Sequence, residues 1–169
     1  MIAKYLDRIM DIYLLNKTGK TNSNSEEHRL LCRDIPELLQ TKYQGYYIKG
    51  SEGNGNRTPY PWICIMDPSI TRTPQKGLYV AILFQKNMEG FYIALNQGIT
   101  FFKENYNKKA YAIAQEAASY FRKDIDIHDA TDTINLQSFK ADNGYGFEKT
   151  TVVGNYFKKG HYTKEDLIV

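Results

Sequence analysis

Four short apolar runs between residues 42 and 98 limit what this chain can fold into. The runs are KYQGYYIKG, YPWICIMD, LYVAILFQ and FYIALNQG, and each is rich in Ile, Val, Tyr or Phe and bounded by Gly, Pro or Asn. Runs of this length and composition are typical of β-strands. The segment KNMEG between the last two has the length of a hairpin loop, so we expect those two strands to be antiparallel.

Helical patterns flank this block on both sides. Apolar residues recur every three or four positions from Ile2 to Tyr13, and again from residue 102 to 125, where we expect one helix of about five or six turns. Ser25 is a candidate cap for a helix that starts at SNSEEHRLLC, and Pro36 suits the first turn of another. The sequence therefore predicts an α/β fold of the α+β type, with a mixed, largely antiparallel sheet flanked by helices.

The C-terminal part is less regular. DTINL, from residue 132 to 136, alternates like a strand, whereas KADNGYGFEKT, from 140 to 150, has the composition of a loop. Thr163 is a candidate cap for a short helix in TKEDLIV. A length of 169 residues fits a single domain. Because the chain stops as this helix begins, we expect that domain to be the N-terminal module of a longer protein.

Bulk composition narrows the class of protein but names no function. The 169 residues are 42% hydrophobic and 24% charged, which is ordinary for one globular domain. The net charge of +3 is too small to indicate nucleic-acid binding by itself, although 14 tyrosines supply rings that suit stacking on bases. Two distant cysteines and the lack of an apolar run of about 18 residues predict a reduced, cytoplasmic protein without a membrane partner.

The glycine-rich stretch GSEGNGN, from residue 50 to 56, first suggests a phosphate-binding loop. Gly50 and Gly55 have the spacing of a Walker A motif, but Asn56 occupies the lysine position and Arg57 the hydroxyl position. Pro59 and Pro61 also prevent the helix that such a loop needs. A dinucleotide fingerprint fails because a strand follows instead of a helix. We therefore expect neither a nucleotide cofactor nor any other cofactor.

Catalytic and metal-binding patterns are equally weak. The three histidines have no metal-ligand spacing among themselves or with the cysteines, and no serine lies in a glycine-flanked elbow. The acidic segment DIDIHDATD, from 124 to 132, has the composition of a solvated turn more than that of a metal site. The sequence therefore predicts a domain that is not itself an enzyme.

One ordered set of motifs carries more information than any single residue. Between Ile48 and Thr100 the chain contains GSEGNGN, the dipeptide Pro61-Trp62, KGLYVAILF and LNQGIT. In order and spacing this block resembles the family of McrB-like N-terminal DNA-binding domains of modification-dependent restriction systems. The resemblance implies an α/β module that binds duplex DNA carrying 5-methylcytosine or a related base and flips that base into a pocket. It also implies, as partners, a downstream GTPase domain of the AAA+ class and a nuclease subunit.

The resemblance assigns expected roles to particular residues. Trp62 and Tyr79 fall where the family has pocket aromatics, and Leu83 falls where an apolar residue lies near the methyl group. Tyr145 is the candidate for a late pocket tyrosine. From the residues alone, a tryptophan and a leucine in apolar strands are more often core residues, so both interpretations stay open.

The glycine-rich loop and its neighbours are expected to contact DNA. Asn54 lies where the well-known family member has a tyrosine that fills the gap left by the flipped base. It could bond to the orphaned guanine, the task could pass to Arg57 or Tyr60, or Asn54 could merely tolerate a left-handed turn. The full sets are Ser51, Asn54, Asn56, Arg57 and Tyr60 for the loop, and Lys49, Arg57, Arg72 and Lys76 for phosphates.

Three other functions remain open at this stage. The same scaffold could read an unmodified sequence or a different modified base. The domain could be a nuclease with a carboxylate and lysine cluster, or a protein-interaction module whose tyrosines face a partner chain.

Overall fold

The computed structural model describes residues 1–15, 19–125 and 129–167. Its centre is one five-stranded sheet in the order β1-β2-β3-β4-β5, in which every neighbouring pair is antiparallel. The strands are β1 (Tyr47–Asn54), β2 (Asn56–Met66), β3 (Leu78–Phe84), β4 (Gly90–Gln97) and β5 (Thr151–Lys158). The predicted fold class is confirmed, with a sheet that is antiparallel throughout.

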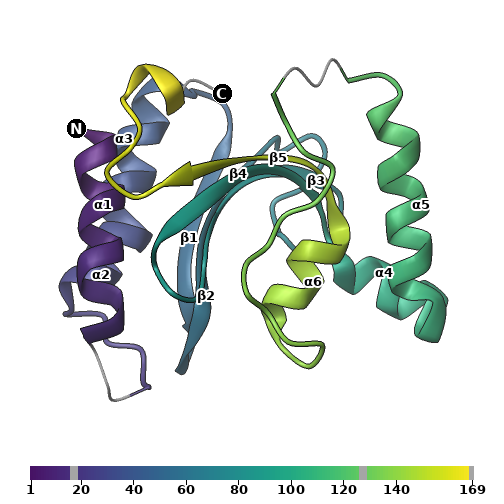
Figure 1. The fold of residues 1–169 in the computed structure, drawn as a ribbon, viewed down its shortest axis with the longest axis horizontal. Coiled ribbons are helices and arrows are strands. Elements are labelled where there is room, and N and C mark those ends of the chain that lie inside the picture. The colour runs from purple at the N-terminus through teal and green to yellow at the C-terminus, as the bar shows by residue number, and fades with distance from the viewer. Residues whose placement is uncertain (16–18, 126–128, 168–169) are drawn as a thin grey trace.

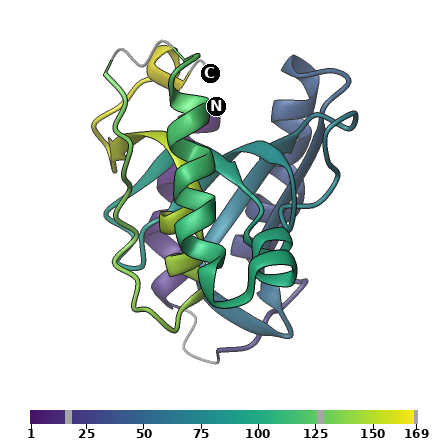
Figure 2. The same cartoon turned by 90° about the vertical axis from the view of Figure 1, so that its right-hand side faces the viewer.

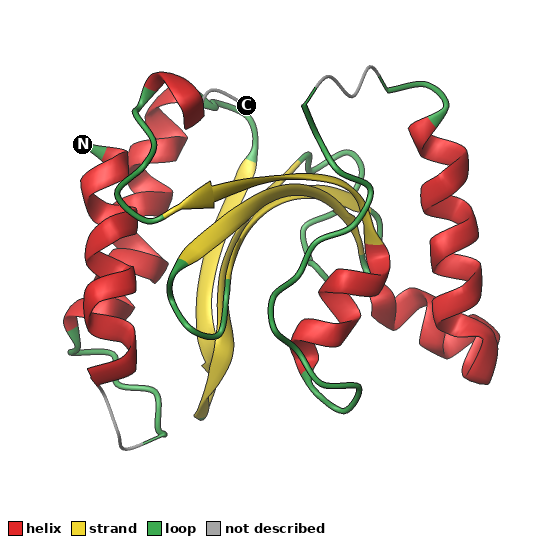
Figure 3. Ribbon diagram, in the orientation of Figure 1, coloured by secondary structure: helices red, strands yellow, loops and turns green. Residues whose placement is uncertain are grey.

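Helices cover both sides of the curved sheet (Figure 1). The first group lies at the left of that view and comprises α1 (Ile2–Ile12), α2 (Glu26–Arg29) and α3 (Ile35–Lys42). The second group comprises α4 (Ile99–Tyr106), α5 (Ala110–Arg122) and α6 (Asn143–Thr150), with α6 beneath the arch of the strands (Figure 3). Turning the molecule brings α5 to the front and shows that it runs along the outside of this second layer (Figure 2).

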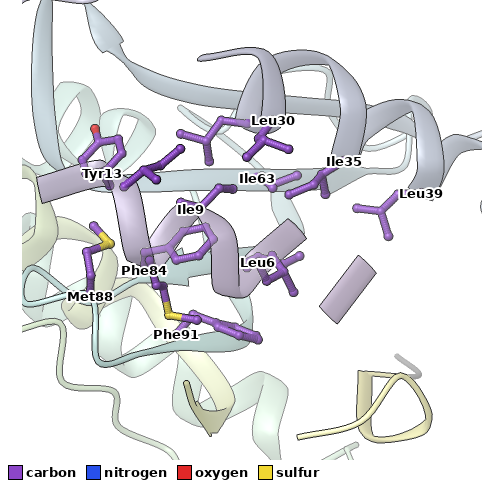
Figure 4. Close-up of a cluster of buried hydrophobic side chains, with 14 of the residues drawn as sticks. Leu6, Ile9, Tyr13, Leu30, Ile35, Leu39, Ile63, Phe84, Met88 and Phe91 are labelled. Atoms are coloured by element: carbon purple, nitrogen blue, oxygen red, sulfur yellow. The ribbon is translucent and has the colours of Figure 1, made fainter. Parts of the chain in front are cut away.

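The main core lies between the first helical group and one face of the sheet (Figure 4). Helix α1 supplies Leu6, Ile9 and Met10 to it at helical spacing, as the sequence predicts. Because side chains alternate across a strand, β2 sends Ile63 to this core and Cys64 to the opposite face. That opposite face carries a second core, with Tyr60, Cys64, Met66, Tyr79, Ala81, Leu83, Ala94, Ile134 and Leu136.

Several local predictions are confirmed. The Ser25 side chain accepts a hydrogen bond from the backbone N–H of His28 and caps α2. Pro36 lies in the first turn of α3, and the KNMEG segment joins β3 and β4 as an antiparallel hairpin. Thr163 caps a single 3-10 turn, Glu165–Leu167, instead of an α-helix.

The single long helix predicted from residue 102 to 125 is wrong. Helix α4 ends at Tyr106, and a 3-10 turn, Asn107–Lys109, separates it from α5. Asn107 breaks the helix because it takes a positive φ of 48°, a conformation that asparagine tolerates better than most residues. The periodic pattern continues across the break, so it does not reveal the change of direction.

The C-terminal part also differs from the prediction. DTINL forms no strand in the described structure, although Ile134 and Leu136 are buried as its alternation suggests, and Thr131 makes one isolated bridge to Gly154. The expected loop at 140–150 is instead largely helix α6, and TVVGNYFK forms the fifth strand. Two glycines make α6 a poor helix by propensity, so tertiary packing must hold it.

Two further predictions were that the chain has no metal site and no membrane-spanning segment. The segment from residue 126 to 128, which includes His128 and the middle of DIDIHDATD, lies outside the described residues. Within the described ranges, no group of three or more His, Cys, Asp and Glu is placed to hold a metal ion. None of the helices in those ranges is long and apolar enough to cross a bilayer.

Candidate nucleic-acid interface

The glycine-rich stretch forms a β-hairpin that projects from the sheet. The sequence suggests a loop here, but β1 runs to Asn54 and β2 starts at Asn56, so only Gly55 forms the turn. Gly53 has a φ of 115°, and a Cβ there would lie 2.1 Å from the backbone oxygen of Asn56. Any side chain at Gly53 would therefore open the hairpin.

Asn54 lies at the exposed tip of this hairpin. The left-handed conformations belong to its neighbours, Gly53 and Gly55, and Asn54 is not among the residues with positive φ. A role as a residue that tolerates a left-handed turn is therefore excluded. Asn54 lines two neighbouring hollows, with volumes of about 400 and 410 Å³, which also share Asn143 of α6.

The first of these hollows is the candidate base-binding cavity. Its volume of about 400 Å³ lies within the usual range for small-molecule sites. The walls come from the hairpin, the ends of β3 and β4, the 74–75 loop, the start of α4 and one face of α6. The lining residues are Ser51, Gly53, Asn54, Thr58, Trp62, Pro74, Gln75, Tyr79, Gln97, Ile99, Thr100, Asn143, Gly146, Phe147 and Thr150.

Two of the predicted pocket aromatics line this cavity. Trp62 is partly buried on β2, and Tyr79 is 3% exposed on β3. Burial raises the pKa of Tyr79 well above its usual range, because a phenolate in an apolar wall would be poorly solvated. Tyr79 therefore stays neutral at physiological pH and keeps a hydroxyl proton to donate.

Helix α6 supplies a wall that the sequence does not predict. Asn143, Gly146, Phe147 and Thr150 follow the spacing of one helical face, and all four line the cavity. That spacing is present in the sequence, but the glycines and polar residues of this segment conceal it. Phe147 thus takes the place in the wall that the prediction gave to Tyr145.

A buried polar network holds α6 against the sheet. The side-chain amide of Asn96 donates to the backbone oxygen of Phe147 and to the Thr151 hydroxyl, both at 3.1 Å. The Thr150 hydroxyl donates in turn to the Asn96 side-chain oxygen. These bonds compensate for the weak helix propensity of α6 and fix the cavity wall.

Leu83 and Tyr145 lie outside this wall. Leu83 is opposite Trp62 on the neighbouring strand and only 1% exposed, and it packs in the second core. Tyr145 lies edge-on to Tyr111 of α5, with ring centroids 5.2 Å apart, and its ring also contacts the Lys149 amine. Because Tyr145 and Phe147 are two positions apart on α6, their side chains lie on different faces of the helix.

Replacing Leu83 with alanine is expected to lower the free energy of unfolding by about 2–5 kcal/mol, because it leaves a cavity in a closed core. Chemical denaturation measures this change. A Leu83→Ala protein that keeps its stability but no longer distinguishes methylated from unmethylated DNA would instead put Leu83 in contact with the base.

Arg57 and Tyr60 turn inward and do not offer their polar groups to a duplex. The Arg57 side chain is 5% exposed, donates to the backbone oxygen of Tyr13 at 2.9 Å and stacks over the Tyr13 ring at 3.9 Å. The Tyr60 hydroxyl donates to the Asp142 carboxylate at 2.7 Å and ties β2 to the start of α6. Burial and the Asp142 charge both raise the pKa of Tyr60.

Arg57 belongs to a charged cluster beneath the hairpin. Its guanidinium lies 3.4 Å from the Glu27 carboxylate and 3.7 Å from that of Glu52. Glu52 is 1% exposed and also contacts the Nδ1 atom of His28 at 2.8 Å. The cluster joins α2 to the hairpin, and the charged groups of Arg57, Glu27 and Glu52 contact one another within the domain.

Three exposed cations, Lys49, Arg72 and Lys76, lie on β1 or in the loop whose Pro74 and Gln75 line the cavity. Lys49 lies on β1 two residues before Ser51, on the same side of the strand, and Lys76 adjoins the cavity residue Gln75. The Arg72 guanidinium lies 5.9 Å from the ring centre of Tyr47, the residue two positions before Lys49. Asn56 is also exposed and accepts a hydrogen bond from Lys20 at 2.9 Å.

Comparison with known protein families identifies the family to which the chain belongs. Residues 8–169 match the MrcB-like, N-terminal domain family, which is nearly the whole chain. The chain belongs to this family. It is therefore a McrB-type N-terminal domain, of a class of DNA-binding modules from restriction systems. A search of curated proteins found no match. The assignment confirms the resemblance of the 48–100 block and extends it to both flanks.

Proposed function

We propose that this McrB-type domain recognises a modified cytosine, 5-methylcytosine or a close relative, by flipping it out of duplex DNA into the cavity beside Trp62 and Tyr79. The observation that carries the proposal is the cavity itself, which combines aromatic walls with an exposed hairpin at its edge. A closed pocket can test the size of a C5 substituent and the Watson–Crick edge together. A residue that only reaches into the major groove can contact the methyl group and the 4-amino group, but not N3 and O2 of the Watson–Crick edge.

The hairpin suits the second task of a base-flipping protein. Extrusion costs a few kcal/mol of lost stacking and pairing, and stacking on aromatic rings offsets part of it. We infer that the tip at Asn54, which is exposed, enters the space that the base leaves. Its side-chain amide can form hydrogen bonds to the unpaired guanine. These bonds would stabilise the guanine in place of the stacking that an aromatic residue at this position would provide.

Phosphate contacts are assigned to the exposed cations Lys49, Arg72 and Lys76. They lie next to the cavity or on the same side of β1 as Ser51, where a duplex that delivers a base must lie. Cations in this position neutralise phosphates and set the register of the protein on DNA, but carry no sequence information. Arg57 is left out because its partners are within the domain.

The domain is proposed to read DNA and not to cut it. Hydrolysis of GTP by an AAA+ domain and cleavage by a nuclease subunit would belong to other parts of a McrBC-like system, acting on DNA in the cytoplasm. Residues 1–169 would then be the N-terminal specificity module. Incubation with magnesium and plasmid DNA is expected to leave the plasmid intact.

Equilibrium binding to matched duplexes tests this function. Two duplexes that differ only by one 5-methyl group are titrated at several fixed salt concentrations, since phosphate contacts make every affinity depend on salt. We expect tighter binding of the methylated duplex at each concentration. Equal affinities throughout would remove the modification-reading claim, and no binding to either duplex would remove DNA recognition as well.

The second candidate is a domain that reads an unmodified sequence or another modified base. Asn54 favours it, because an amide at the hairpin tip can form base-specific hydrogen bonds that an aromatic ring cannot. Selection from random duplexes, with and without enzymatic methylation, separates the two. Enrichment of a single unmethylated sequence would support this candidate.

A further inference from the structure

The amide of Gln97 is held in one orientation at the cavity wall. Gln97 ends β4 and is 4% exposed, and its Nε2 atom donates to the backbone oxygens of Ala114 at 3.0 Å and Thr150 at 3.3 Å. Both amide hydrogens are therefore used, one toward α5 and one at the end of α6. Two carbonyl acceptors on this side exclude the flipped amide, so the Oε1 oxygen must point away from them.

The Oε1 oxygen of Gln97 has no hydrogen-bond partner within the described part of the chain. This oxygen is not fully enclosed either. It is not one of the unpaired polar atoms that the described residues bury completely, and Gln97 lines the cavity. A nearly buried acceptor without a partner is costly unless a ligand or water supplies a donor. Gln97 thus brings to the cavity wall one fixed acceptor that the described residues leave unused.

We propose that Gln97 Oε1 accepts a hydrogen bond from the 4-amino group of the extruded base and so makes the cavity select cytosine derivatives over thymine. This inference rests on the proposed function and names the group that reads the base. Cytosine presents an amino donor at position 4, whereas thymine presents a carbonyl oxygen. Thymine in the same pose would bring two acceptors together without a proton between them.

Recognition of the methyl group alone cannot distinguish 5-methylcytosine from thymine. 5-Methylcytosine and thymine carry the same methyl group on C5, and their rings stack equally well on Trp62. A reader of methylated cytosine that tested only shape and stacking would also accept every thymine that left its pair. Hydrogen bonding at the Watson–Crick edge is the difference that remains, and a site built for it rejects the analogue that lacks the donor.

Tyr79 supplies a complementary group in the same cavity. Its hydroxyl has no hydrogen-bond partner among the described residues, and burial keeps it protonated. A hydroxyl donor beside a carbonyl acceptor matches the edge of cytosine, which has an amino donor at position 4 and acceptors at N3 and O2. Thymine carries a proton on N3 and fits this pair less well.

The test uses the unchanged protein and four duplexes that differ at one base opposite guanine. The base is 5-methylcytosine, unmodified cytosine, thymine, or 5-methylpyrimidin-2-one, which has hydrogen in place of the 4-amino group. At fixed salt we expect the 5-methylcytosine duplex to bind roughly 10- to 100-fold tighter than the thymine and pyrimidinone duplexes. Both of those bases pair poorly with guanine and leave the helix more easily, so pairing strength works against the expected result.

A pair of variants then assigns the effect to one residue. Gln97→Met keeps the length of the side chain and removes the acceptor, and should bring the preference for 5-methylcytosine over 5-methylpyrimidin-2-one close to one. Gln85→Met is the matched control. Gln85 is also buried, but its amide donates to Asn135 and accepts from Tyr156, and it is not among the residues that line the cavity. Its variant should keep the full preference.

The outcomes separate this inference from the function on which it rests. Discrimination of 5-methylcytosine from cytosine, together with equal binding of the pyrimidinone duplex, would overturn the role of Gln97 and leave the function standing. Equal binding of all four duplexes would overturn both. If Gln97→Met does not fold, the duplex series on the unchanged protein still shows whether the 4-amino group is recognised.

Discussion

Trp62→Ala is expected to weaken binding of a duplex with one 5-methylcytosine by roughly 10- to 100-fold, the range expected when one base loses its aromatic stacking partner. Binding of the unmodified duplex, which relies on phosphate contacts, should change little. Trp62 is partly buried in the cavity wall, so the variant should also lose some stability. Its affinities must therefore be measured well below its unfolding midpoint.

Tyr92→Ala provides the matched control for Trp62. Tyr92 is another partly buried aromatic residue on the same face of the sheet, since it pairs with Leu83, which in turn pairs with Trp62. Its ring packs on Tyr156 and lies outside the cavity wall. The control should lose stability but keep its preference for methylated DNA. Full discrimination by Trp62→Ala would remove this residue from the base site.

Arg57→Met is expected to lower the free energy of unfolding by about 3–5 kcal/mol, because it leaves the buried Glu52 carboxylate without its cation. The Glu27 carboxylate loses the same partner. The loss of the cation over the Tyr13 ring adds to this cost. Denaturation of the variant and of the parent protein measures the difference.

Arg72→Met separates this structural role from phosphate binding. Arg72 is exposed, so its variant should unfold like the parent protein. It should bind methylated and unmethylated DNA more weakly by the same factor, and the slope of log affinity against log salt should fall by about one. An Arg57→Met protein that is fully stable but shows this DNA-binding defect would return Arg57 to the interface.

Sequence patterns predicted the parts of the fold that depend on local signals. The four central strands, α1 and the Ser25 cap follow from periodicity and from capping chemistry. The break at Asn107 and the fifth strand did not follow, because long-range packing decides both. The strands between Ser51 and Thr58 were not predicted either. Glycines and asparagines in this segment indicate a loop, and tertiary contacts override that local preference.

The candidate site was predictable only in part. The family motifs led to Trp62 and Tyr79, and the structure brings both to one cavity. Arg57 shows the limit of this reasoning. An arginine beside a loop that is expected to contact DNA is predicted to bind phosphate, and only the structure reveals its buried acidic partners. Gln97 and Phe147 required the structure, since their roles come from the packing of α5 and α6 against the end of β4.

A crystal structure of the domain with a duplex that carries one 5-methylcytosine tests base flipping most directly. The account predicts that the methylated base lies outside the helix, in the cavity beside Trp62 and Tyr79, with the hairpin tip at Asn54 next to the unpaired guanine. A bound duplex with the methylated base still stacked and paired, and with the cavity free of any base, would contradict it.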